Sequence, residues 1–231
     1  MRKTSAGVVL SLAAATAAFA DLKETKRLEA CGEVVHDVMG VKEEIPRDLT
    51  AKAECVAVIP GVKKAAIGIG GRFGYGVVTC RSQGGNGPWG APLMISIKGG
   101  SLGFQIGGQE VDLVLLIMNP KGIDSLLKNN FTLGADASVA AGPIGRTAEA
   151  ATDAQMRAEI LSYSRSRGLF LGLSLEGAVM KPDEKANHGV YGEGMDPRDL
   201  LLRNKYAVPK AAKPFIDELE KLAPRRGEGW K

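Results

Sequence analysis

The spacing of apolar residues changes several times along the chain, and each change marks a predicted element. Residues 22–39 place Leu28, Cys31, Val35 and Val38 at the three- and four-residue intervals of one helical face. From residue 55 onward, short apolar runs separated by glycine and proline are typical of strands. The predicted strands are 55–59, 65–70, 74–81, 93–98, 103–106, 111–118, 132–141 and 169–180.

Capping residues mark the remaining helices. Asn119-Pro120 and Asp196-Pro197 each combine a side-chain cap with a proline in the first turn, which predicts helices over 119–127 and after residue 196. Thr152 and Gln155 form a capping box that predicts a helix over 152–167. Short helices are also expected over 45–53 and 209–222, whereas 183–194 (DEKANHGVYGEG) is expected to be a loop.

Strands occur in runs and do not alternate regularly with helices. This order favours an α+β fold with a largely antiparallel, strongly curved sheet, barrel-like or sandwich-like, and flanking helices. No linker-like segment divides the chain, so we expect one main domain.

Small residues occupy alternate positions in several predicted strands. In residues 68–76, Gly68, Gly70, Gly74 and Gly76 fall on one side, and similar alternation recurs in 101–107, 133–142 and 171–179. A face without Cβ atoms allows a helix, a second layer or a ligand to approach the backbone closely. Isolated polar residues share these faces, namely Arg72, Gln105, Asp136 and Glu176. They are consistent with a buried ion pair of Arg72 with a carboxylate, with a ligand site, or with exposed positions.

The N-terminal segment has the pattern of a secretory signal peptide. Two basic residues precede an apolar run over 7–15, and Ala18-Phe19-Ala20 matches a cleavage site. We therefore expect residues 1–20 to be removed, leaving a mature chain without a transmembrane span. We expect it to be periplasmic or extracellular, including a peripheral position on a membrane.

The charge balance argues against a nucleic-acid-binding protein, and the cysteine content suggests one disulfide. The chain has 30 Lys and Arg against 26 Asp and Glu, too even a balance to indicate nucleic-acid binding. In an oxidising compartment, one disulfide is expected among Cys31, Cys55 and Cys80. Cys55 and Cys80 bracket the glycine-rich stretch at the ends of strand-like runs, which favours that pair.

Motifs of enzymes are absent or incomplete. The glycines from Gly68 do not fit G-x-G-x-x-G, and the two histidines, His36 and His188, have no neighbouring ligand pattern. We expect no cofactor, no metal site and no catalytic activity. A hydrolase that uses Asp136 and Glu176 is the weakest alternative, since nothing in the sequence fixes their separation.

Basic residues suggest a different chemistry. The first helix carries Lys23, Lys26 and Arg27, and a predicted strand connection carries Lys63 and Lys64. Such residues are often simply solvated. Well-placed cations also contribute about 1 kcal/mol each to binding of anionic lipid. With Arg72, these are the candidate lipid-binding residues.

Three blocks resemble the SYLF domain family in sequence and order: IPRDLTAKAECVAVIPGVKKAAIGIGGRFGYGVVTCR, FTLGADASVAAGPIGR and AEILSYSRSRGLFLGLSLEGAVM. The resemblance implies a lipid-binding SYLF domain over residues 21–206, followed by a C-terminal helix and flexible tail over 207–231. It implies a binding module for anionic phospholipid with a phosphoinositide-like headgroup; some family members bind actin. The alternative is a structural or protein-interaction module in the envelope, with a protein partner in place of a membrane.

Overall fold

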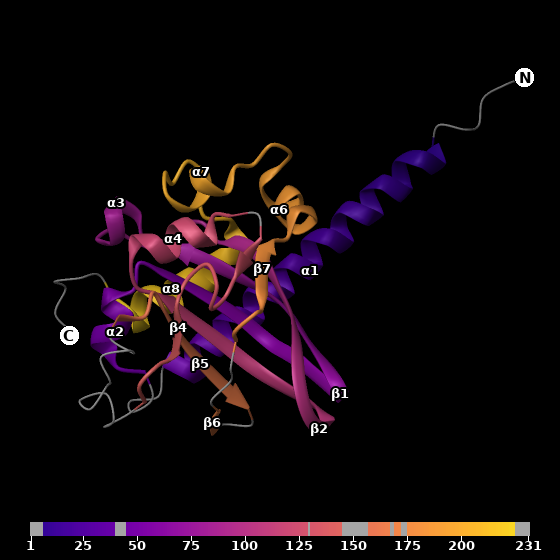
Figure 1. Ribbon diagram of the computed structural model, residues 1–231. Helices are drawn as coiled ribbons and strands as arrows, with labels where there is room; N and C mark the ends of the chain where they lie inside the picture. Colours follow the sequence, from indigo (N-terminus) through magenta and orange to yellow (C-terminus); the bar gives the residue numbers. More distant parts are fainter. Residues whose placement is uncertain are drawn as a thin grey trace, which may run out of the picture.

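A curled β-sheet forms the centre of the computed structural model, and two helices cross one of its faces (Figure 1). The structure describes residues 7–39, 45–128, 130–144, 157–166, 169–171 and 175–224. The sheet order is β3-β7-β2-β5-β4, with β1 paired to β2 and β6 paired to β5. All these pairings are antiparallel except β4 with β5, so the predicted α+β class and curved, mainly antiparallel sheet are confirmed.

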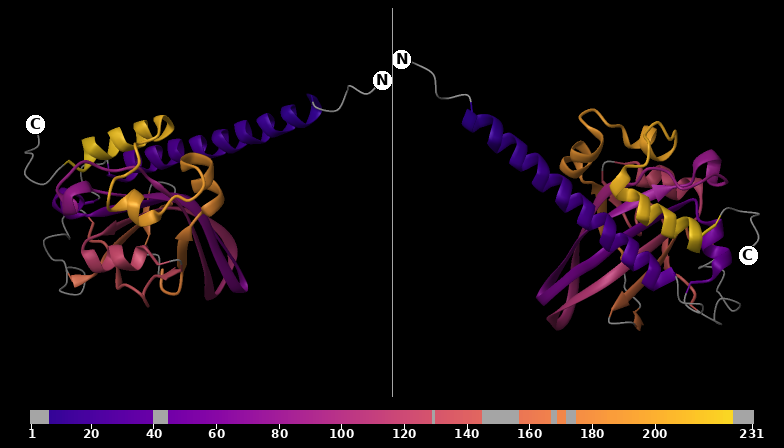
Figure 2. Two further views of the ribbon diagram at one scale, coloured as in Figure 1. Left: turned by 90° about the horizontal axis from the view of Figure 1, so that it is seen from above. Right: turned by 180° about the vertical axis from the view of Figure 1, so that it is seen from behind.

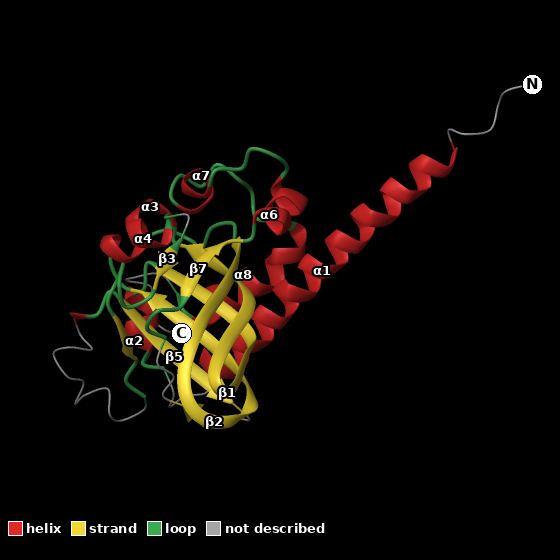
Figure 3. Ribbon diagram, turned by 45° about the vertical axis from the view of Figure 1, so that its right-hand side comes forward, coloured by secondary structure: helices red, strands yellow, loops and turns green. Residues whose placement is uncertain are grey.

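Two long strands, β1 (Cys55–Cys80) and β2 (Leu93–Ile117), replace the five shorter strands predicted between residues 65 and 118 and the one predicted over 55–59. They pair from Cys55↔Ile117 to Val78↔Leu93 and form a bent ribbon (Figure 3). Pro60-Gly61 does not end a strand, because the ladder resumes at Val62 after a register shift. Gly61 has φ +54° there, and its amide donates to Asp112. The interruption predicted between the strands 55–59 and 65–70 therefore contains a β-bulge within one continuous strand.

The two ends of β1 meet. The Arg81 amide, next to the last residue of β1, donates to the Glu54 carbonyl at 2.8 Å. Cys55 and Cys80, the favoured pair, form a disulfide across the same junction. A short helix, α3 (Ser82–Gly85), follows before the chain enters β2. The ribbon thus nearly closes on itself, as in a half-barrel.

The later strands differ from the prediction. β5 (Ile160–Ser166) pairs with residues 112–117 of β2, so the predicted helix over 152–167 is wrong where the structure describes it. Residues 152–156 and 167 of that segment lie outside the described residues. β6 (Leu169–Leu171) and β7 (Val179–Pro182) replace the single strand over 169–180, with a turn at Glu176-Gly177. Likewise β3 (Phe131–Thr132) and β4 (Val139–Ala141) flank a turn over 134–136.

Helices form where the Asn-Pro and Asp-Pro caps predicted them. Asn119 accepts from the Gly122 amide at the start of α4 (Pro120–Leu126), and Asp196 caps α7 (Pro197–Leu201). The predicted 45–53 and 209–222 helices appear as α2 (Arg47–Lys52) and as η2 (Lys210–Ala212) with α8 (Lys213–Leu222). The predicted loop after residue 183 is wrong, because α6 (Glu184–Tyr191) forms there with Asp183 as its cap.

One face of the sheet packs against α1 (Gly7–Met39), and α8 packs along α1. The shared core includes Leu28 and Val35 from α1, Phe215 from α8, and Val77 and Met94 from the sheet. Residues of opposite parity, such as Val78 and Ile95, form a second core. The N-terminal half of α1 projects beyond the sheet (Figure 2). Within the described residues, every helix is too short or too polar to cross a bilayer.

Glycines in β1 permit close packing, as the alternation predicted. A Cβ on Gly76 would lie 2.0 Å from the Val58 carbonyl oxygen, and one on Gly74 would lie 2.9 Å from Ile59 Cγ2. Both glycines face the first part of the same strand. The small residues therefore allow the later part of β1 to pack closely on the earlier part of the same strand.

Candidate functional site

An aromatic pair marks the part of the α1-covered face that α1 leaves open. Phe73 and Tyr75 have the same strand parity as the buried Val77, but they remain 39% and 38% exposed. Their rings meet edge to face with centroids 4.7 Å apart. The intervening Gly74 points into the fold, so the alternation along β1 presents both rings to solvent.

Three lysines from three elements surround this pair. Lys23 of α1 has its ammonium 5.4 Å from the centre of the Tyr75 ring, and Lys98 of β2 lies 5.8 Å from that of Phe73. Lys181 of β7 is paired in register with Ser96, so Lys98 and Lys181 are diagonal neighbours on one face. All three lysines are exposed, and among the described residues none has an ion pair. We call Lys23, Phe73, Tyr75, Lys98 and Lys181 the cationic–aromatic surface.

A polar pocket of about 380 Å³ opens within this surface. Its lining consists of Tyr75, Ser96, Lys98, Asn130, Lys181, Pro182, Asp183 and Glu184. The lysines, the Ser96 hydroxyl and the Asn130 amide supply donors suited to phosphate oxygens. On the opposite wall, Asp183 already accepts a hydrogen bond from Arg27. The pocket lining therefore combines two lysines with one carboxylate that is already paired to Arg27 and one exposed carboxylate, Glu184.

Arg27 does not belong to the exposed surface that the sequence predicted. Its side chain is 6% exposed, and Nη2 donates to Asp183 at 2.9 Å. Its guanidinium also lies 4.9 Å from the centre of the Tyr75 ring. Arg27 therefore ties α1 to the start of α6 and to β1, and it supports the surface from beneath.

The other predicted lysines do not join one site. Lys26 is exposed on α1, whereas Lys63 lies opposite Glu110 on the ribbon and Lys64 is half-buried beside it. Of the predicted group, the structure therefore brings Lys23 and the buried Arg27 to the aromatic pair, and of these two only Lys23 is exposed. Phe73, Tyr75, Lys98 and Lys181 were missed, although the Gly-aromatic alternation over 73–76 was a usable signal.

Arg72 lies on the small face, as predicted, and is 8% exposed. Its strand parity is opposite to that of Phe73, which separates it from the aromatic pair. Burial lowers the pKa of its guanidinium from the ordinary value. A Cβ on Gly99 would lie 3.3 Å from Arg72 Cγ, so the glycine leaves space for the arginine stem. Its place favours a structural role.

The two carboxylates of the hydrolase alternative are unsuited to acid–base chemistry. Lys128 donates to Asp136 at 2.7 Å, and the Thr132 amide donates to its other oxygen at 2.8 Å. These bonds, chiefly that from Lys128, lower the pKa of Asp136, which disfavours a role as a general acid. Glu176 is exposed in a turn against Gly134. We find no support for this weakest alternative.

Comparison with known proteins agrees with the sequence resemblance. The family model described as "Ysc84: Las17-binding protein actin regulator" matches residues 98–222. Protein YSC84 of Saccharomyces cerevisiae is 34% identical over 191 residues, covering 81% of this chain and 40% of that protein. The SH3 domain-containing YSC84-like protein 1 of Xenopus laevis is 37% identical over 187 residues, covering 80% and 55%.

This chain spans 40–55% of the length of these relatives. The match therefore concerns a shared domain and does not cover the rest of each relative. Within that domain, identity above 30% extends over about four-fifths of the chain, through both the ribbon and the later strands. The chain belongs to the Ysc84, or SYLF, family, whose domain is a non-catalytic binding module.

Proposed function

We propose that this protein is exported and binds anionic phospholipid at a membrane surface through the cationic–aromatic surface. The observation that carries the proposal is the convergence on two exposed rings of three lysines that have no ion pair within the described part of the chain. Lysines near a membrane are attracted to anionic headgroups, and aromatic side chains enter the headgroup region. The pocket beside Lys98 and Lys181 has the donors to hold a headgroup phosphate.

Export rests on separate support. The N-terminal sequence has the order of a signal peptide, and the Cys55–Cys80 disulfide suits an oxidising compartment. The description of the matching family names regulation of actin. For an exported chain, we infer that the lipid-binding property is the part that applies.

Vesicle co-sedimentation tests the lipid proposal. We expect binding to vesicles of phosphatidylcholine mixed with phosphatidylglycerol, and little binding to phosphatidylcholine alone. The double variant Lys98→Gln/Lys181→Gln should weaken binding about 30-fold, because each cation contributes about 1 kcal/mol. Added salt should weaken the wild-type protein in the same direction.

A matched control removes two exposed lysines outside the surface, Lys52 and Lys121. Lys52→Gln/Lys121→Gln has the same net charge as the test variant and should bind almost like wild type. If both double variants lose affinity equally, overall charge drives binding and the surface assignment is wrong. Equal sedimentation with both vesicle types would reject the electrostatic mechanism itself.

A further inference from the structure

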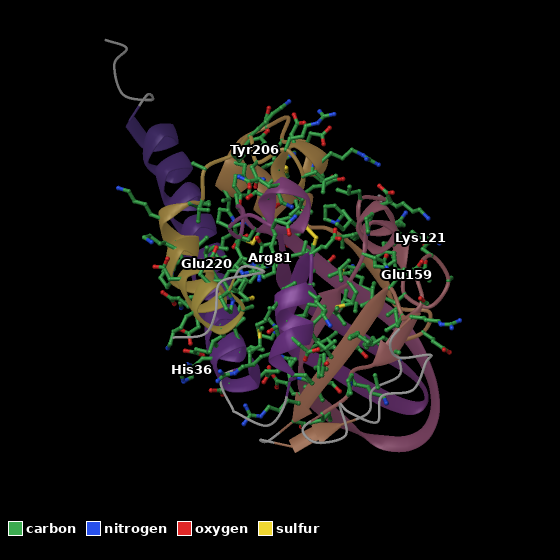
Figure 4. All side chains as sticks on the ribbon, turned by 90° about the vertical axis from the view of Figure 1, so that its left-hand side faces the viewer. His36, Arg81, Lys121, Glu159, Tyr206 and Glu220 are labelled. Atoms are coloured by element: carbon green, nitrogen blue, oxygen red, sulfur yellow. A yellow bond between two sulfur atoms is a disulfide. The ribbon has the colours of Figure 1, made fainter. Side chains whose placement is uncertain are left out.

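A groove runs between α1 and α8, away from the cationic–aromatic surface. The two helices pack closely, since a Cβ on Gly32 would lie only 3.7 Å from Phe215 Cα. Above this contact the surface forms a groove of about 380 Å³. Its floor is apolar and consists of Leu28, Gly32, Ala211, Pro214 and Phe215. In Figure 4, His36 marks the end of α1 beside α8.

Carboxylates border this apolar floor. Glu29, Glu33 and Asp37 follow one another at four-residue intervals along α1, and Glu218 faces them from α8. Like charges at this spacing destabilise a helix by roughly 0.2–0.5 kcal/mol per pair. The arrangement therefore has an electrostatic cost that a positively charged partner would relieve.

Two of these carboxylates lack a compensating charge. Glu218 lies 2.9 Å from His36 and 3.6 Å from Lys221, and Asp37 lies 3.8 Å from Arg165. Within the described part of the chain, Glu29 and Glu33 have no ion pair, and both are exposed. They flank Gly32, where the groove floor is least covered by side chain.

We propose that this groove docks a cationic, amphipathic polypeptide segment of a partner protein. An apolar side chain of the partner would rest on Gly32 and Phe215, and its lysines or arginines would meet Glu29 and Glu33. Charge complementarity selects this occupant, because an anionic lipid surface would be repelled by the same carboxylates. The groove is thus a second binding site, chemically opposite to the cationic–aromatic surface.

A designed peptide provides a direct probe. We would titrate the protein against a fluorescein-labelled amphipathic helix of leucine and lysine, and follow anisotropy at low and high salt. A peptide with glutamate in place of lysine serves as the reference. We expect saturable binding of the lysine peptide, weakened by salt, and no binding of the glutamate peptide.

Matched charge reversals locate the binding. Glu29→Lys/Glu33→Lys should weaken binding of the lysine peptide at least tenfold. Asp124→Lys/Glu193→Lys changes net charge equally at exposed positions outside the groove and should leave affinity within about twofold. The membrane variant Lys98→Gln/Lys181→Gln should also retain peptide binding, so failure of the lipid proposal is distinguishable from failure of this one.

Three results would overturn the inference. The lysine peptide could show no saturable binding, or both charge reversals could weaken it equally, which would indicate non-specific attraction. The third is concentration-dependent self-association of the wild-type protein in sedimentation equilibrium that Glu29→Lys/Glu33→Lys abolishes. In that case, the occupant is a second copy of this chain.

Discussion

Three basic residues within five positions of α1 have different chemical roles. Lys23 and Arg27 are four residues apart, and both lie over the ring of Tyr75. Arg27 is further buried and donates to Asp183, while Lys26 is exposed. The angular position of each residue on the helix therefore decides whether its charge is available to a ligand. Arg27 stabilises the packing of α1 on the rest of the fold, and Lys23 borders the candidate site.

Replacing Arg27 should lower stability, not simply lipid affinity. In Arg27→Met, the half-buried Asp183 loses its cation, and we expect a loss of about 1–3 kcal/mol in the free energy of unfolding. Lys26→Met, one residue away and exposed, should change it by less than about 0.5 kcal/mol. Urea denaturation measures both. Adding Asp183→Asn to Arg27→Met should cost less than the sum of the single changes; additive losses would contradict the pairing.

Single residues of the candidate site were only partly predictable. Cys55 and Cys80 could be paired because they bracket one apolar, strand-like region. Lys98 and Lys181 are 83 residues apart in sequence, and they meet only through the register between β2 and β7, which no local pattern contains. The burial of Arg27 has the same origin, because Asp183 reaches it from the far end of the chain.

At the scale of elements, the glycines of β1 determine whether the ribbon can fold over. Gly76→Ala would place a Cβ 2.0 Å from a backbone oxygen of Val58, where no side-chain rotation can relieve the clash. We expect a loss of about 1–3 kcal/mol or more in the free energy of unfolding. Gly189→Ala in α6 meets nothing within 4 Å and should raise stability by up to about 1 kcal/mol. Thermal unfolding compares the two; a neutral Gly76→Ala would show that this close approach is not required.

Elements with local signals were predicted well, and elements held by distant contacts were not. The caps Asn119 and Asp196 define α4 and α7 within a few residues of sequence. Residues 160–166 instead form a strand, because their backbone pairs with 112–117 and their apolar side chains enter both cores. In α6, Asn187 bonds both the amide and the carbonyl of Met94. That contact stabilises a helix whose glycines and polar residues suggested a loop.

At the scale of the whole molecule, α1 carries positive charge at one position along its length and negative charge at another, although the overall charge of the chain is nearly balanced. Basic and acidic residues nearly balance, at 30 against 26. Yet Lys23 belongs to the cationic–aromatic surface, whereas Glu29 and Glu33 border the groove with α8. Because the two surfaces occupy different parts of one helix, the proposed lipid binding and the proposed docking of a cationic segment are compatible in one molecule.

The disulfide connects the global fold to the proposed export. It closes a loop of 25 residues in sequence, between the two ends of β1, where a hydrogen bond from Arg81 to Glu54 also joins them. Loop-closure entropy predicts that Cys55→Ala/Cys80→Ala lowers the free energy of unfolding by about 3 kcal/mol. Reduction of the wild-type protein should have a similar effect, and reductant should not affect the variant. Cys31 is buried, and desolvation raises the pKa of its thiol, so it should compete poorly as a disulfide partner. Urea denaturation with and without reductant measures these differences. Equal stability of oxidised and reduced protein would show that the ribbon remains closed without its covalent link, and would remove the need for an oxidising compartment.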